Sequence, residues 1–403
     1  MSAAAVNPFP AGSKLLYPDL WADRKDTLST LRKAFSIAFA SSEPMLIQVL
    51  GDYGAGKSHT LRHIEHKVLE GEWEKTKGFP IYMESPGTDL LDFFNRFLSA
   101  TKMETLQSAL REMLARIMLS KPKNLQKDML EGKISADEVV RRMAPTSLRE
   151  DLTKELVEIF KGTGFSLRDT ALSDYWEHLA IALSMLPQGG DEQFAAAKWL
   201  TFGKLYKYDK ELLKIEEYPS SAGYIAANTV AIIRLISHAA NYRKVVLLID
   251  ELETVTESRD LAQCIRQLID SGLPELVIVL GSSTEASEVF GEGALIRRIH
   301  MTLKLSELSP SDAKQFVSDY LARSPRGKAK DSLTPFDDAS VSVFNAAAKG
   351  KVSSLLPILN RAYDMYIREG WKEVGKDQAQ KVLSEAEKLG IYQPSSEEEL
   401  LKT

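Results

Sequence analysis

Eight residues, Gly-Asp-Tyr-Gly-Ala-Gly-Lys-Ser at 51–58, constrain the fold of this chain more than any other stretch. They match the G-x-x-x-x-G-K-[ST] pattern of a phosphate-binding loop. The apolar run 45–50 before them predicts a strand, and the spacing of Leu61, Ile64 and Val68 after them predicts a helix. Because strand, glycine loop and helix follow in the required order, the sequence predicts a site for a nucleotide.

Each position of this loop has a chemical reason. The glycines let the backbone turn so that consecutive N–H groups and the following helix N-terminus face the phosphates. Lys57 would reach the β- and γ-phosphates, and the Ser58 hydroxyl would bind Mg²⁺. We therefore expect ATP or GTP, with Mg²⁺, as the cofactor. The expected nucleotide-binding residues of this region are Gly51, Asp52, Tyr53, Gly54, Ala55, Gly56, Lys57, Ser58 and His59.

A second motif, Val-Val-Leu-Leu-Ile-Asp-Glu, occupies residues 245–251. Such a continuous apolar run is typical of a parallel strand buried on both faces, and α/β sheets bind ligands at the carboxyl ends of their strands. We expect Asp250 to hold Mg²⁺ and Glu251 to orient or deprotonate the attacking water. An Asp-Glu pair after an apolar strand is common by itself, so its combination with the phosphate loop gives the motif its specificity.

Composition narrows the class of protein. The net charge of −5 over 403 residues gives no global electrostatic reason for nucleic-acid binding, so any such contact must be local. No apolar run reaches the length of a membrane span, and the first ten residues lack the basic start and apolar core of a signal peptide. We therefore expect a cytoplasmic protein without membrane contact. The single cysteine, Cys264, lies on an apolar helical stripe, which favours packing over reactivity.

The distance in sequence between Lys57 and Asp250 exceeds what a minimal nucleotide-binding core needs, so we expect an insertion between them. Further strand-like runs at 79–83 and 276–280 belong to the core, and the second ends in a polar Gly-Ser-Ser-Thr. The expected organisation is an N-terminal segment at 1–44, a nucleotide-binding core at 45–95 and 216–306, a helical insert at 96–215, a helical lid at 307–392 and a polar tail at 393–403.

These motifs resemble the AAA+ ATPases, and among them the origin-recognition and initiator-like clade. The resemblance covers about residues 15–95 and 220–390. It implies an α/β P-loop NTPase with a parallel sheet sandwiched by helices, a long helical insert and a C-terminal helical lid. It also implies an ATP hydrolase, acting as a homo-oligomer, that drives the assembly or remodelling of a partner.

The resemblance assigns roles to individual positions of the core. Residues 51–58 are similar to Walker A, and Asp250 with Glu251 to Walker B. Ser283 or Thr284, after the second buried strand of this region, is similar to sensor 1. We therefore expect Thr284 to contact the γ-phosphate or the attacking water.

Three arginines receive roles from the same resemblance. Arg298, with Arg297 as the alternate, is similar to the arginine finger that completes the site of a neighbouring subunit. Arg24 lies where the family places an N-terminal arginine near the base. These assignments imply an active site that two subunits share.

The sequence departs from the family at one position of the lid. The clade usually carries a sensor 2 arginine in a Gly-x-x-Arg setting, whereas Gly350-Lys-Val-Ser353 places a serine there. Lys351 or Arg361 could substitute from a neighbouring turn. Without such a cation, the coupling between the γ-phosphate and closure of the lid is weaker, which favours slow hydrolysis. The alternative function is therefore an ATP-dependent switch or scaffold with little hydrolysis.

Other features leave further alternatives open. The element Trp199-Leu-Thr-Phe-Gly203 and the acidic strand resemble prokaryotic ATPases of BREX-type phage defence, which implies a role in antiviral defence. The basic run 323–330 is typical of a solvated loop, with DNA contact as the alternative. His59, His63 and His66 share one helix face, where a packing or solvated role is favoured over a metal site.

Overall fold

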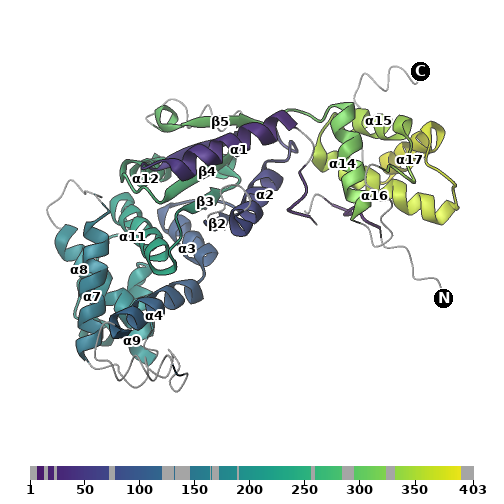
Figure 1. The fold of residues 1–403 in the computed structure, drawn as a ribbon. Coiled ribbons are helices and arrows are strands. Elements are labelled where there is room, and N and C mark those ends of the chain that lie inside the picture. The colour runs from purple at the N-terminus through teal and green to yellow at the C-terminus, as the bar shows by residue number, and fades with distance from the viewer. Residues whose placement is uncertain are drawn as a thin grey trace.

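The computed structural model describes most of the chain, and Figure 1 shows how its parts are arranged. A sheet with its covering helices lies between a group of helices from the middle of the chain and the C-terminal helices. Arg24, Thr284 and the part of the basic run after Arg323 lie outside the described residues. The described residues are 7–12, 17–21, 25–71, 78–119, 131, 146–163, 165, 172–187, 190–255, 259–283, 295–323 and 332–391.

Five strands form one parallel sheet in the order β2-β3-β4-β1-β5. Residues of β3 and β4 are buried throughout, as expected of parallel strands covered on both faces. The predicted strands at 45–50 and 79–83 are confirmed, while β4 extends past residue 280 because its last two residues pair with the end of β1. The strands are β1 (Met45–Leu50), β2 (Phe79–Met83), β3 (Val245–Ile249), β4 (Leu276–Ser282) and β5 (Met301–Lys304).

Helices cover both faces of the sheet because successive strand residues point to opposite faces. On one face, Leu31 and Leu61 share an apolar cluster with Ile47. On the other face, Phe93 and Ile265 share a larger cluster with strand residues. The first face carries α1 (Lys25–Ala40) and α2 (Lys57–Glu70), and the second carries α3 (Leu90–Thr101), α11 (Ala222–Ala240) and α12 (Arg259–Asp270).

The long insert between β2 and β3 is helical, as predicted, and it continues the larger apolar cluster. Tyr175 is fully buried and its hydroxyl donates to Asn228 of α11, while the indole N–H of Trp199 donates to the Glu216 carbonyl at 2.8 Å. These contacts join the insert to α11 and to the segment that precedes it. Its described helices are α4 (Met103–Leu119), α7 (Thr146–Lys161), α8 (Leu172–Met185), α9 (Gly190–Leu200) and α10 (Lys207–Leu213).

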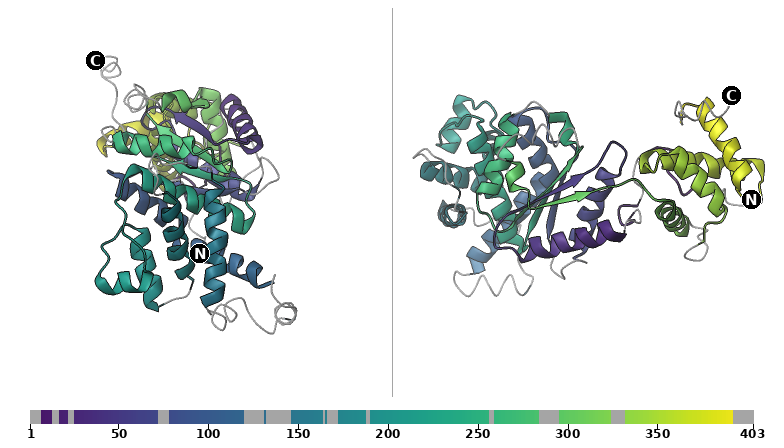
Figure 2. Two further views of the ribbon diagram at one scale, coloured as in Figure 1. Left: turned by 90° about the vertical axis from the view of Figure 1, so that its left-hand side faces the viewer. Right: turned by 90° about the horizontal axis from the view of Figure 1, so that it is seen from above.

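The C-terminal helices form a separate apolar cluster, which the right-hand view of Figure 2 places beyond the carboxyl ends of the strands. Two residues that precede α1, Phe9 and Leu20, belong to this cluster, and Phe9 stacks on Tyr320 with ring centroids 5.6 Å apart. None of the described helices is both long and apolar enough to cross a membrane. The four helices are α14 (Pro310–Ala322), α15 (Asp338–Ala347), α16 (Val352–Glu369) and α17 (Lys376–Lys388).

Candidate functional site

A pocket of about 210 Å³ lies at the carboxyl ends of β1 and β3. Three segments that are distant in the sequence line it: the glycine loop after β1, the acidic residues after β3, and the first turn of α16. The structure therefore brings together most of the residues that the sequence assigned to the nucleotide. These predicted residues are Tyr53, Gly54, Gly56, Lys57, Ser58, His59, Asp250 and Glu251.

The conformation of the loop requires two of its glycines. Gly54 and Gly56 have φ values of +83° and +98°, in the left-handed region. A Cβ atom on Gly54 would stand 2.2 Å from the Ser353 hydroxyl oxygen, so a larger residue would also collide with the Ser353 side chain at the start of α16. Lys57 is the first residue of α2, so the N-terminal N–H groups of that helix face the pocket.

Lys57 lies deep in the pocket, with only 8% of its side chain exposed. Its ammonium group donates to the carbonyls of Gly51 at 2.9 Å and Asp52 at 3.4 Å. It also forms an ion pair with Glu253 across 3.4 Å. The lysine is thus held inside the loop by acceptors with which a phosphate would compete.

Glu253 is a pocket residue that the sequence analysis missed. Its Oε1 atom pairs with Lys57, whereas its Oε2 atom is buried without a hydrogen-bond partner. It follows Glu251 by two positions, and the 3₁₀ turn Leu252–Val255 directs it back to the pocket. The sequence does contain a signal that could have identified it, because a third acidic residue follows the Asp-Glu pair after one leucine.

Asp250 is almost completely buried, with 2% of its surface exposed, and both of its carboxylate oxygens accept hydrogen bonds. Oδ2 accepts from the Tyr82 hydroxyl at 2.8 Å, and Oδ1 accepts from the Glu251 backbone N–H at 2.9 Å. A Cβ atom on Gly281 of β4 would come within 2.9 Å of Oδ1, so this glycine leaves room for the carboxylate. The orientation of Asp250 is therefore tightly defined.

Glu251 projects from an unusual backbone position, because its φ of +47° lies in the left-handed region. Partial burial and then the negative charges of Asp250, Glu84 and Glu253 raise the pKa of the Glu251 carboxyl, while Lys57 opposes them. A carboxylate with a raised pKa is a better proton acceptor, which suits the predicted role of this residue.

The donors at the pocket fit Mg²⁺, which prefers hard oxygen ligands and is usually bound through one or two protein groups and the substrate phosphates. Asp250, Ser58 and the unpartnered oxygen of Glu253 are of that kind. Within the described part of the chain, no group of three His, Cys, Asp or Glu side chains could hold a metal by itself.

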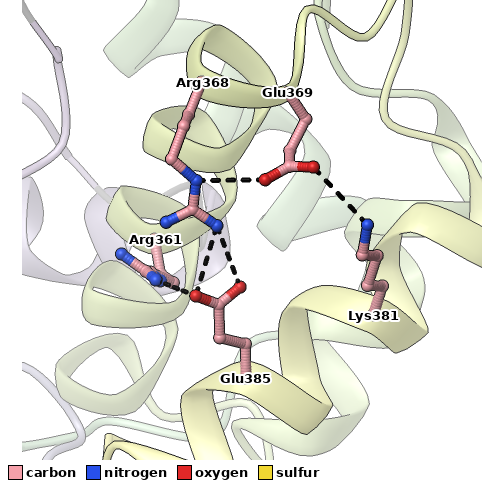
Figure 3. Close-up of polar contacts among 5 residues, drawn as sticks. All are labelled: Arg361, Arg368, Glu369, Lys381 and Glu385. Atoms are coloured by element: carbon pink, nitrogen blue, oxygen red, sulfur yellow. Dashed lines mark hydrogen bonds and ion pairs between the residues drawn. The ribbon is translucent and has the colours of Figure 1, made fainter.

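Ser353 lies directly at the glycine loop, and its backbone N–H donates to the Gly54 carbonyl across 3.4 Å. Arg361, which the sequence analysis considered as a substitute cation, does not line the pocket. It lies about two turns further along α16 and pairs with Glu385 of α17. Figure 3 shows it in an ion-pair network, whose other members are Arg368, Glu369 and Lys381.

Arg298 lies at the opposite end of the sheet from the glycine loop. It precedes β5, which runs parallel to β1. The four residues of β5 alone span about 13 Å at 3.3 Å per residue. Its guanidinium forms two hydrogen bonds with the Asp270 carboxylate at the end of α12, at 2.5 and 2.8 Å. Arg297 beside it is exposed. Neither arginine lines the pocket of its own subunit.

Two of the three histidines of α2 have a packing role, as favoured from the sequence. Nε2 of His59 contacts the Leu20 carbonyl, and Nδ1 of His63 contacts the Pro18 carbonyl at 3.0 Å. Burial lowers the pKa of His63 to about 4. The helix of the glycine loop is thereby attached to the N-terminal segment.

The structure describes only some of the residues expected near the γ-phosphate and near the base of the nucleotide. Ser283 directly follows β4, whereas Thr284 and Arg24 lie outside the described residues. Their roles stay predictions. Ser282, the last residue of β4, accepts a hydrogen bond from the Gln48 side chain at 2.9 Å.

Comparison with known proteins places the fold. No family model and no curated protein matches the sequence. The chain is similar to the Aeropyrum pernix ORC2 protein in its ADPNP and ADP complexes, with TM-score 0.50 and 11% identity, covering 93% of this chain and 71% of that one. It also matches the Aeropyrum pernix ORC1 protein in complex with DNA and Drosophila ORC bound to DNA, both at TM-score 0.45, with 12% and 13% identity. These two matches cover 93% and 94% of this chain and 68% and 66% of the others.

The likeness to the ORC2 protein, together with the order of the sheet, shows that this chain has a P-loop NTPase fold. At 11% identity it shows the fold alone. The predicted fold class, with a parallel sheet between helices, a helical insert and a C-terminal helical region, is confirmed.

Proposed function

We propose that this protein binds ATP with Mg²⁺ in the pocket and hydrolyses it where two subunits meet, and that the nucleotide state drives the assembly or remodelling of a partner. The convergence of Lys57, Asp250 and Glu251 on one pocket supports this most strongly. These residues supply a phosphate-binding cation, a ligand for the metal and a proton acceptor.

Each residue has one task in this proposal. Lys57 exchanges its carbonyl and Glu253 partners for phosphate oxygens, and the N-terminus of α2 adds partial positive charge. Asp250 and Ser58 hold Mg²⁺, which neutralises phosphate charge when bound. Glu251 orients water and accepts its proton. Arg298 of a neighbouring subunit supplies the arginine that is absent from the lining of the described pocket.

The test is a calorimetric titration with ATP and Mg²⁺, which measures the affinity for ATP. Lys57→Ala should lower ATP affinity about 100-fold, equivalent to about 3 kcal/mol, because a buried charged contact is lost. Lys67→Ala is the matched control, since Lys67 lies on the same helix and pairs with Glu70 outside the pocket. Wild-type protein that does not bind ATP, or a Lys57→Ala variant of unchanged affinity, would refute the proposed site.

One observation favours the second candidate function, an ATP-dependent switch with little hydrolysis. Ser353 occupies the position next to Gly54 where the related clade carries an arginine, and Arg361 is engaged with α17. Measuring turnover alongside binding separates the two functions. Tight binding with almost no turnover, even at high protein concentration, would favour the switch.

DNA association, a role in phage defence and a cytoplasmic location stay predictions from the sequence and its resemblances. Of the four basic residues in the run 323–330, Arg323 is the one described, and it pairs with Asp19 of the N-terminal segment. At most three of the four would therefore be available to phosphates unless this ion pair opens.

A further inference from the structure

A chain of three side chains connects the helix of the glycine loop to the acidic end of β3. Tyr82 of β2 lies on the sheet face that α2 covers. Its hydroxyl donates to Oδ2 of Asp250 at 2.8 Å. Above its ring lies the guanidinium of Arg62, a residue of α2, with 3.4 Å between the guanidinium carbon and the ring centroid. Nothing in the phosphate-loop or acidic motifs identifies Tyr82 or Arg62.

The contact of Arg62 with the ring fixes the plane of Tyr82. A cation stacked this closely on an aromatic face is attracted by the ring, and the planar guanidinium covers it in a way that an ammonium cannot. Glu65, one turn along α2, holds the same guanidinium through a 2.8 Å ion pair. The tyrosine hydroxyl is therefore directed at Asp250 by two groups of the helix that begins with Lys57.

The hydrogen bond leaves Asp250 able to bind a metal. A carboxylate has about four lone-pair positions, and Tyr82 and the Glu251 N–H occupy one on each oxygen. A tyrosine hydroxyl is protonated at neutral pH, so Tyr82 is the donor in this hydrogen bond. Partners that orient a metal-binding carboxylate typically contribute 10- to 100-fold to metal affinity.

We propose that Tyr82 is a positioning residue, which holds the Asp250 carboxylate in the orientation that binds Mg²⁺, and that Arg62 holds Tyr82. This inference rests on the proposed function, because it assumes a nucleotide with Mg²⁺ in the pocket. It adds a physical link between the two motifs, because the Tyr82 ring contacts both the helix of the glycine loop and the metal ligand.

The experiment measures ATP affinity of the full chain at a series of Mg²⁺ concentrations and in EDTA. Tyr82→Phe should raise the Mg²⁺ concentration at half-maximal effect about 10-fold, while ATP affinity in EDTA stays within twofold of wild type. Tyr208→Phe is the matched control, because the exposed Tyr208 hydroxyl donates to Asp191 at 2.9 Å far from the pocket. It should not change either value.

Arg62→Lys provides a second variant if Tyr82→Phe unfolds below the assay temperature. It keeps the charge and loses the planar stacking, so the Mg²⁺ midpoint should rise about two- to threefold. A wild-type Mg²⁺ midpoint in the folded variants would overturn the inference. An equal loss of affinity in EDTA and in Mg²⁺ would also overturn it, because Tyr82 would then shape the whole pocket. Wild-type protein that binds no ATP would refute the proposed function itself.

Discussion

The two ends of the parallel sheet carry different parts of the proposed site. The carboxyl end holds Lys57 and Asp250 under the first turn of α16, and no arginine lines the described pocket there. The amino end holds Arg298, engaged in two hydrogen bonds with Asp270. In one subunit, the residues proposed to bind phosphates therefore lie at one end of the sheet. Arg298 lies at the other end and does not reach the pocket of its own subunit. If the proposed function holds, we therefore expect a complete site to need two subunits.

The largest expected effect concerns the amino end. Arg298→Ala should lower the turnover of the assembled protein by roughly 10³- to 10⁵-fold, the range known for arginines supplied to other NTPases, while ATP affinity stays unchanged. Steady-state ATPase assays and an ATP titration measure the two quantities.

Asp270→Ala is the control for this prediction, because it breaks the same ion pair and leaves the arginine in place. It should retain turnover within a few-fold of wild type. Equal losses in Arg298→Ala and Asp270→Ala would assign the arginine a structural role in its own subunit.

The next effect concerns the carboxyl end. Glu251→Gln should lower turnover by about 10²- to 10⁴-fold and leave ATP bound, because the amide cannot accept a proton from water. Single-turnover assays that follow bound ATP and ADP measure this directly. Glu84→Gln removes a neighbouring charge without removing the base, and it should stay within a few-fold of wild type. Wild-type turnover in Glu251→Gln would exclude that residue as the base.

The smallest effect concerns Glu253. Glu253→Gln should tighten ATP binding about three- to tenfold, because Lys57 no longer leaves an ion pair when phosphate enters. Loss of this negative charge should also lower the raised pKa of Glu251 and move the acid limb of the pH–rate profile to lower pH. Weaker ATP binding would instead show that Glu253 helps to hold the metal.

The elements that position the site could be predicted from the sequence where local patterns decide them. The buried strands at 45–50 and 245–249 and the glycine loop follow from apolar runs and from φ values that glycine adopts freely. The start of α11 after Ser221 follows from a cap, because the Ser221 hydroxyl accepts from the Tyr224 N–H.

The contacts between distant residues could not be predicted in this way. Tyr82 reaches Asp250 only because β2 pairs with β3 in a particular register. Ser353 reaches Gly54 only because the C-terminal helices fold back onto the loop. The pairing of Arg298 with Asp270 depends on where α12 ends. Local periodicity contains no information on these distances.

A mixing experiment tests the shared site most directly. Arg298→Ala protein retains an intact pocket, and Lys57→Ala protein retains an intact arginine, so neither should hydrolyse ATP alone. We expect their mixture to recover part of the wild-type activity, and the specific activity of wild-type protein to rise with its concentration. A mixture without recovery, together with wild-type activity that is independent of concentration, would contradict a site formed by two subunits.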